Sequence, residues 1–139
     1  MRTINRILNY VTVFVFFLAI SSFSNLQAQT FDAKDMDGTW ERNDGMRLSI
    51  SGTAVFAEGS KAMIFNVGGS GWPESAAHYN YKFQDIKHKG GNTWTASNYK
   101  YSQQKQTVFS SGNSIFLMSK DKSEFTCDGY TYYRKSLVH

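Results

Sequence analysis

The chain has 139 residues and a single cysteine, Cys127. This length suits one domain, and one cysteine excludes an internal disulfide. All 11 acidic residues follow residue 28, so residues 29–139 carry 13 Lys and Arg against 11 Asp and Glu, a formal charge of +2. Such a weakly basic balance gives no strong reason to expect a nucleic-acid partner.

The first 28 residues have the order of a secretory signal peptide. Arg2 and Arg6 form a basic start, residues 11–20 are an uncharged apolar run, and residues 21–28 are polar and small. A membrane anchor is the alternative, but a spanning helix needs about 20 apolar residues. We therefore expect cleavage after Ala28, a secreted or periplasmic location and no membrane span in the mature chain.

Most of the chain after Asp37 alternates apolar and polar residues with the two-residue period of β-strands. In one predicted strand, Tyr79, Tyr81 and Phe83 share a face, opposite Lys82. Residues 114–119 are apolar on both faces, which predicts cover on both sides, by the interior and by a neighbour, a loop or a partner chain. The candidate strands, some of which must merge, are 38–42, 46–51, 54–58, 61–67, 76–88, 93–101, 106–110, 114–119, 123–127 and 130–135.

Glycine-containing turns separate these strands, and Asp128-Gly129 is typical of a two-residue hairpin. No helical periodicity is sustained after residue 30, apart from single turns near 31–37 and 74–77. The fold class predicted is all-β, an antiparallel up-and-down meander over residues 29–139. Closure into a barrel of about eight strands protects the strand edges. A two-sheet sandwich is the alternative, and an outer-membrane barrel needs longer strands, of about 9–11 residues.

Gly38-Thr39-Trp40, near the start of the mature chain, resembles the G-x-W signature of lipocalin-like (calycin) barrels. In lipocalins this tryptophan lies at the closed end, and an arginine of the last strand packs across it. Arg134 is the matching position here, and a guanidinium over an indole contributes about 0.5–2 kcal/mol. The resemblance therefore implies structural closure of a barrel through Trp40 and Arg134.

The chain also resembles the first hairpin of avidins, because Gly45 follows Trp40 by five residues. The avidin positions that bind biotin correspond here to Arg42 and Met46, which cannot supply the same polar groups. No late amphipathic helix of the lipocalin kind is present in the pattern. The resemblance thus implies a barrel class and no particular ligand.

Catalytic and metal motifs are absent from the sequence pattern. Ser70 lacks the G-x-S-x-G spacing of a nucleophile elbow. The histidines and acidic residues form no spaced zinc cluster, so we expect no metal and no cofactor. Cys127 fits a buried strand residue, with an intermolecular bridge or a reactive thiol as the alternative.

Aromatic residues and one loop supply the candidate ligand-binding residues. The loop of residues 68–74 holds three glycines, a tryptophan and a proline, and loops on a rigid scaffold often carry function. Tyrosine suits a wet cavity because its ring is apolar and its hydroxyl polar. The candidates are Trp72, His78, Tyr79, Tyr81, Tyr99 and Tyr132.

These patterns predict a non-catalytic barrel that binds a small, partly apolar ligand of unknown identity, with a homo-oligomer possible. Two alternatives remain open. One is an interaction module that binds a glycan or a protein through an exposed aromatic face. The other is a small barrel enzyme of the isomerase or cyclase type that uses His78 or a tyrosine.

Overall fold

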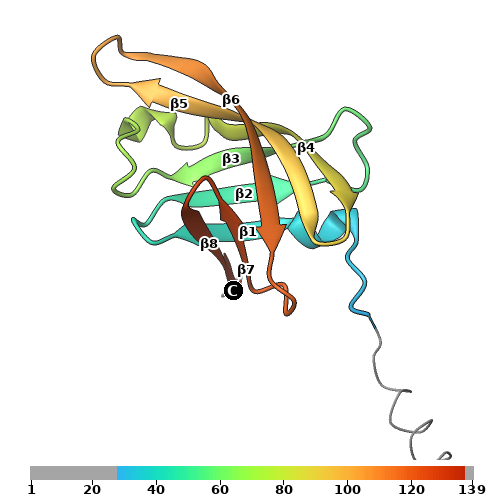
Figure 1. Ribbon diagram of the computed structural model, residues 1–139. Coiled ribbons are helices and arrows are strands. Elements are labelled where there is room, and N and C mark those ends of the chain that lie inside the picture. Colours follow the sequence, from blue (N-terminus) through green and yellow to red (C-terminus); the bar gives the residue numbers. More distant parts are fainter. Residues whose placement is uncertain (1–27, 137–139) are drawn as a thin grey trace, which may run out of the picture.

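The computed structural model describes residues 28–136, and they form a closed barrel of eight antiparallel strands joined in chain order (Figure 1). The predicted all-β meander and its closure are confirmed. The predicted signal peptide lies outside the described residues, except for Ala28. The elements are η1 (Ala33–Met36), β1 (Gly38–Arg42), β2 (Arg47–Ser51), β3 (Ser60–Asn66), η2 (Glu74–Ala76), β4 (Tyr81–Gly90), β5 (Thr93–Ser102), β6 (Thr107–Met118), β7 (Glu124–Cys127) and β8 (Tyr130–Lys135).

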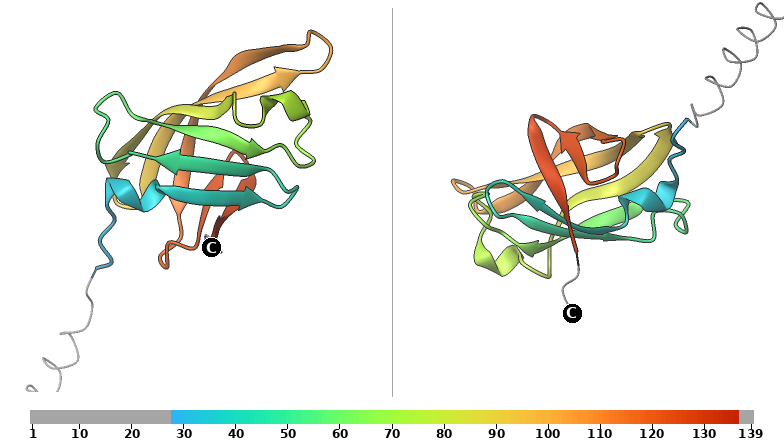
Figure 2. Two further views of the ribbon diagram at one scale, coloured as in Figure 1. Left: turned by 180° about the vertical axis from the view of Figure 1, so that it is seen from behind. Right: turned by 90° about the horizontal axis from the view of Figure 1, so that it is seen from below.

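The two ends of the barrel differ. Because successive strands alternate in direction, the connections 43–46, 67–80, 103–106 and 128–129 gather at one end, which we call the open end. The short helix η1 lies at the opposite, closed end (Figure 2). The longest connection, residues 67–80, lies at the open end, and loops held by a rigid wall often carry binding residues.

The first and last strands join the barrel through Trp40 and Arg134. The two residues are neighbours across the β1–β8 pair, and the Arg134 guanidinium carbon lies 4.2 Å from the centre of the Trp40 ring. The Trp40 indole N–H donates to the carbonyl of Met36 in η1 at 2.9 Å. At the same end, the Trp94 indole N–H donates to the carbonyl of Ala33 at 3.3 Å. These contacts fasten η1 across the closed end.

The predicted strand 54–58 is wrong, because these residues belong to a loop between β2 and β3. Asp37 holds this loop, since its carboxylate accepts the backbone N–H groups of Gly52 and Thr53 at 3.1 and 3.0 Å. Gly59 then turns the chain with a φ of +101°, where a Cβ would lie 2.6 Å from the backbone of Asp85. Val55 and Phe56 consequently face solvent.

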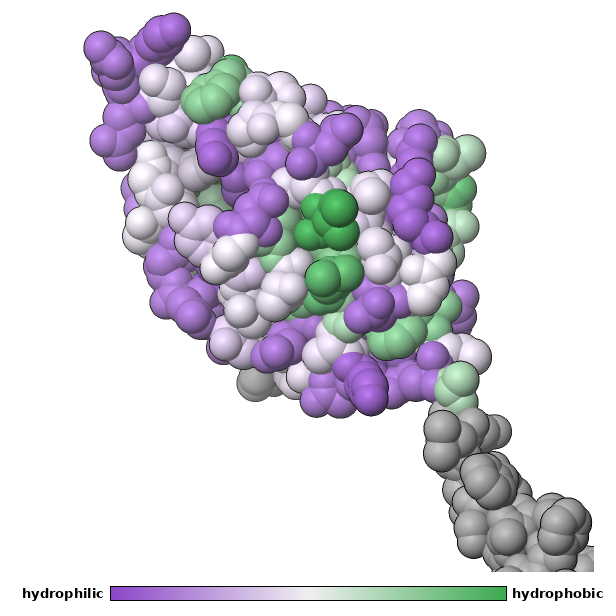
Figure 3. All heavy atoms as spheres, viewed as in Figure 1, coloured by the Kyte–Doolittle hydropathy of each residue, from purple (hydrophilic) through white to green (hydrophobic). Residues whose placement is uncertain are grey.

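Residues 106–110 and 114–119 are not separate strands but parts of the twelve-residue β6. The expected turn near Gly112 is a β-bulge against β5, with Ser111 as the extra residue. Ile115 and Leu117 are 59% and 48% exposed, so the prediction that 114–119 is covered on both faces is wrong for the single chain. Figure 3, in the view of Figure 1, shows a small hydrophobic patch surrounded by polar residues on the side of the barrel along which β6 runs.

Candidate functional site

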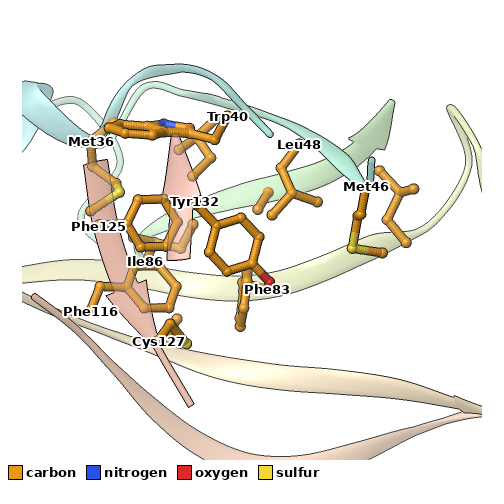
Figure 4. Packing of buried hydrophobic residues seen from close by; sticks show 14 of the residues in the cluster. Met36, Trp40, Met46, Leu48, Phe83, Ile86, Phe116, Phe125, Cys127 and Tyr132 are labelled. Carbon is orange, nitrogen blue, oxygen red and sulfur yellow. The ribbon is translucent and has the colours of Figure 1, made fainter. Parts of the chain in front are cut away.

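The interior holds an apolar cluster of stacked rings. Phe116 and Phe125 stack with centroids 4.9 Å apart, and Phe125 stacks on Tyr132 at 4.7 Å (Figure 4). Phe83 meets Phe116 edge to face at 4.8 Å. Aromatic pairs in these geometries contribute stability beyond the area they bury. We call Phe83, Phe116, Phe125 and Tyr132 the aromatic floor, because the buried polar side chains Arg42, Lys82 and Asn98 lie between it and the open end, beside apolar residues such as Met46 and Val67.

Arg42, the last residue of β1, is one of these polar side chains and is only 7% exposed. Its Nε donates to Asp44 Oδ1 at 2.9 Å, and its Nη2 pairs with the other carboxylate oxygen. The guanidinium carbon lies 4.1 Å from the centre of the Tyr130 ring and 6.0 Å from that of Tyr132. The hydrogen bond from Arg42 holds the pKa of Asp44 below its ordinary value. Arg42 therefore carries a paired positive charge against two tyrosines.

Lys82 points inward because β4 contains a β-bulge. Ala62 of β3 lies opposite Phe83, while the next β3 residue, Met63, lies opposite Tyr81. Lys82 is the extra residue between these pairs, and both Lys82 and Phe83 are buried. A bulge re-aims a side chain in this way, and bulges are frequent beside functional sites.

The Lys82 ammonium is held by neutral groups. Its Nζ donates to Asn98 Oδ1 at 2.6 Å and to the carbonyl of Tyr99 at 2.7 Å, and the residue is only 5% exposed. Burial, helped by the positive charge of Arg42, lowers the pKa of Lys82 to about 8. The negative charge of Asp128 acts in the opposite direction, but neither hydrogen-bond acceptor of the ammonium is a carboxylate.

Asp128 connects the β7–β8 hairpin to its neighbours beyond the point where the backbone pairing of β6 and β7 ends. β6 and β7 pair only at Leu117 and Met118 of β6. Nearer the open end, the Asp128 carboxylate at the β7–β8 turn accepts a hydrogen bond from Asn98 Nδ2 at 2.7 Å and one from the Ser114 hydroxyl. Burial alone would raise the pKa of Asp128, but these hydrogen bonds outweigh it and lower the pKa. Asp128 thus latches the tip of the β7–β8 hairpin to β5 and β6.

Cys127 is buried at the end of β7, next to this latch. Burial, followed by the negative charge of Asp128, raises the pKa of its thiol to about 12. A thiolate is the reactive form of cysteine, so the position of Cys127 favours a packing role over nucleophilic chemistry.

Three of the six predicted ligand-binding residues lie at or near the open half of the interior. Tyr132 belongs to the aromatic floor, and burial raises the pKa of its hydroxyl. Tyr99 is half-buried and packs against the core. Trp72 is buried under the rim, with its ring 6.0 Å from that of Tyr101. A groove of about 410 Å³ runs over this rim, between the β3–β4 loop and the β5–β6 turn.

The other three predicted residues lie on the outside of the barrel. His78 meets Phe65 edge to face at 4.7 Å, and Tyr79 is exposed. Tyr81 lines the outer wall, with the Lys61 ammonium 5.1 Å from its ring centre. The structure therefore does not bring the six candidates together into one site.

A second hollow, of about 390 Å³, lies on the outer wall under the loop that Asp37 anchors. Phe56 and Tyr81 supply aromatic rings there, and Glu58, Lys61 and Asp85 supply charged groups of both signs. The hydroxyl of Ser97 donates to Asp85 at 3.0 Å. This groove is separate from the interior residues Arg42 and Lys82.

Sequence reasoning missed the charged and amide groups of the interior as ligand-binding candidates: Arg42, Lys82, Asn98 and Asp128. A signal was present for Arg42, because residues two apart in a strand share a face and Trp40 faces inward. Asn98 shares a face with Trp94 and Ala96 in the same way. For Lys82 no such signal exists, since the bulge in β4 reverses the alternation.

Other site types have less structural support. Within residues 28–136, no group of three or more His, Cys, Asp or Glu side chains is placed to hold a metal ion. In the same part of the chain, no helix has the length and apolar character needed to cross a membrane. No family model, no curated protein and no solved structure matches the chain.

Proposed function

We propose that this protein is an exported, non-catalytic binding barrel that takes a small, partly apolar ligand with an anionic group at its open end. The observation that carries the proposal is the presence of two cationic side chains, Arg42 and Lys82, both more than nine-tenths buried inside the wall. Burying a charge is unfavourable unless a partner compensates it. A ligand anion is such a partner.

Charge distribution around the pair favours an anion over a neutral molecule. Asp44 neutralises Arg42, whereas Lys82 is bonded to the neutral oxygens of Asn98 and Tyr99. The next carboxylate, Asp128, already accepts hydrogen bonds from Asn98 and Ser114. Asp128 acts on Lys82 only through space, and no carboxylate of the described residues forms an ion pair with Lys82. A ligand anion in direct contact with the ammonium would supply that pair.

The surroundings of the pair suit an apolar body attached to that anion. The aromatic floor lies on one side of the cations, and Tyr130 covers the guanidinium of Arg42. The half-exposed ring of Tyr130 can stack on a flat apolar group, and its hydroxyl can bond to a polar one. Small-molecule sites commonly combine mostly apolar walls with a few placed polar groups.

The non-catalytic part of the proposal rests on the placement of the reactive groups. His78 lies outside the barrel against Phe65. The environments of Cys127 and Tyr132 disfavour their ionised forms. A general base or nucleophile needs a pKa near the working pH, and Lys82 is the one interior group described here that approaches it. We retain the lipocalin-like relationship and the secreted or periplasmic location as parts of the proposal.

Two dyes with one scaffold test the proposal. The probe 8-anilino-1-naphthalenesulfonate is anionic, and N-phenyl-1-naphthylamine is its neutral counterpart. We expect residues 29–139 to bind the anionic dye more tightly, and Lys82→Met to weaken its binding by roughly tenfold, a loss of about 1.4 kcal/mol. Lys61→Met is the matched control, because it removes a lysine that lies near a tyrosine ring on the outer wall.

The expected pattern is loss of anion preference in Lys82→Met and no loss in Lys61→Met. Equal affinity of the wild type for both dyes, or equal behaviour of the two variants, contradicts the anion-binding site. Native mass spectrometry of freshly purified protein provides an independent measurement, because a retained ligand adds its mass to the folded species.

The outer-wall groove favours a second candidate function, the binding of a neutral sugar. Its two aromatic rings can stack on a sugar face, and its carboxylates and lysine can bond to hydroxyls. Titration of the protein with glucose and N-acetylglucosamine, followed by amide chemical shifts, tests this function. Shifts confined to residues around Tyr81 and Phe56 support it, and no shift at either sugar contradicts it.

A further inference from the structure

β6 has an unpaired backbone edge beside the open end. It pairs with β5 from Thr107 to Leu117, but with β7 only through Leu117 and Met118. Within residues 28–136, no strand pairs with the other edge of β6 over 107–113. Figure 1 shows this part of β6 projecting with the end of β5 as a two-stranded ribbon beyond the barrel. N–H and C=O groups on such an edge are a template for another strand.

The edge lacks the usual protection against pairing. Residues 107–113, with the sequence TVFSSGN, are all exposed and contain neither a charged residue nor a proline. Proteins normally place lysine, proline or an inward charge on an exposed edge. The bulge at Ser111 bends one part of it, which leaves Thr107–Ser110 as the regular segment. Val108 and Phe109 make that segment partly apolar.

We infer that Thr107–Ser110 of β6 is the segment through which a second copy of this chain pairs, as two antiparallel β6 strands related by a two-fold axis. In such a pair each strand donates the same backbone hydrogen bonds that it accepts, so the edge is complementary to itself. Two uncharged edges also meet without placing like charges opposite each other. A charged edge would repel its own copy, whereas this one does not.

The positions of the nearby lysines agree with this arrangement. Lys100 lies on β5, across from Phe109, and Lys105 lies in the turn at the tip of the ribbon. Neither belongs to the edge that pairs. The contact is short, so it belongs to the class of small, transient interfaces, and we expect a dissociation constant on the order of 100 µM.

Sedimentation equilibrium and amide hydrogen exchange test the inference on residues 29–139, at protein concentrations from about 5 µM to about 1 mM. We expect a dimer at the upper concentrations and slower exchange of the amides of residues 107–110 as the concentration rises. Phe109→Lys places a cation on each edge and is expected to raise the dissociation constant at least tenfold. Phe65→Lys is the matched control, because Phe65 is 49% exposed on β3 and Phe109 is 45% exposed on β6.

Each other outcome overturns the inference. A monomer at the highest concentration, with unchanged exchange at 107–110, shows that the edge does not pair with itself. A dimer that protects a different surface, such as the exposed face around Ile115, places the contact elsewhere. Protection of 107–110 only after an extended peptide of another protein is added identifies that peptide, and not a second copy, as the partner.

Discussion

The Arg134 guanidinium lies 4.2 Å above the Trp40 ring and also donates to three carbonyls: those of Asp37, Lys122 and Asp35. These acceptors belong to the segment before β1, to the β6–β7 loop and to η1. One side chain therefore joins the first strand, the last strand and the cover of the closed end. Desolvation by burial lowers the pKa of Arg134, and the carboxylates of Asp35 and Asp37 oppose that effect.

We predict that Arg134→Ala lowers the free energy of unfolding by about 2–4 kcal/mol, because it removes the cation–π contact and leaves three carbonyls without their donor. Lys135→Ala is the control on the same strand. Lys135 pairs with Glu41 at 3.1 Å on the surface, and such pairs contribute less than about 1 kcal/mol. Urea denaturation measures the free energy of unfolding of both variants. Equal losses would contradict this structural role of Arg134.

The stability of the protein should rise between neutral and alkaline pH because of Lys82. The pKa of Lys82 is lowered from 10.5 to about 8 in the folded chain. Between these values the unfolded chain binds more protons at this residue, so the free energy of unfolding increases with pH, by roughly 3 kcal/mol at most. Below pH 8 the full penalty of burying the ammonium is present.

Lys82→Met removes this dependence. The stability of the variant relative to the wild type should be highest near pH 7 and should fall progressively towards pH 10, as followed by denaturation at several pH values. Lys61→Met is the control variant, because it removes a lysine from the outer wall. A parallel response of the two variants would show that Lys82 is not desolvated.

Asp128→Asn tests the latch at the β7–β8 turn. Asparagine also tolerates the positive φ of 50° at this position, so the change removes a charge without straining the turn. We expect a loss of about 1–2 kcal/mol at pH 7, since two charge-assisted hydrogen bonds weaken. The folded pKa of Asp128 is depressed, so its contribution is present above pH 4 and is lost as the pH falls through the folded value. The difference between variant and wild type should shrink in acid, and a constant difference would contradict the latch.

Gly68 and Gly91 allow the stability cost of a left-handed backbone to be measured separately from the cost of a steric clash. Gly68 and Gly91 have nearly the same φ, +52° and +51°. A Cβ on Gly68 would lie 2.4 Å from the backbone of Gly45 and Met46, whereas one on Gly91 meets nothing within 4 Å. Gly91→Ala should lower the free energy of unfolding by about 1 kcal/mol, for the left-handed conformation alone. Gly68→Ala should cost several times more and loosen the contact between two open-end loops, as thermal unfolding will show.

Regular alternation made most of the wall predictable from the sequence. Strands such as 38–42 and 130–135 follow from the two-residue period, since one face meets the core and the other meets water. The prediction failed for Tyr79, Tyr81 and Phe83. The two-residue period places them on one face of a strand, but the structure does not. The extra residue Lys82 places Tyr81 outside and Phe83 inside, and a bulge depends on the partner strand rather than on local sequence.

The candidate site was only partly predictable for the same reason. Tyr132 follows from its place in the last strand. Arg42 shares the inward face of Trp40, but its charge favours water, and so does the charge of Lys82. Their burial depends on the partners Asp44 and Asn98. The burial of Lys82 depends also on a bulge that no pattern within a single strand contains.

The difference in length between β6 and β7, twelve residues against four, also makes the seam between these strands the weakest part of the wall. They pair only through Leu117 and Met118 of β6, and side-chain hydrogen bonds of Asp128 make the remaining connection. We therefore expect local opening of the barrel to begin at this seam, because few backbone hydrogen bonds need to break there.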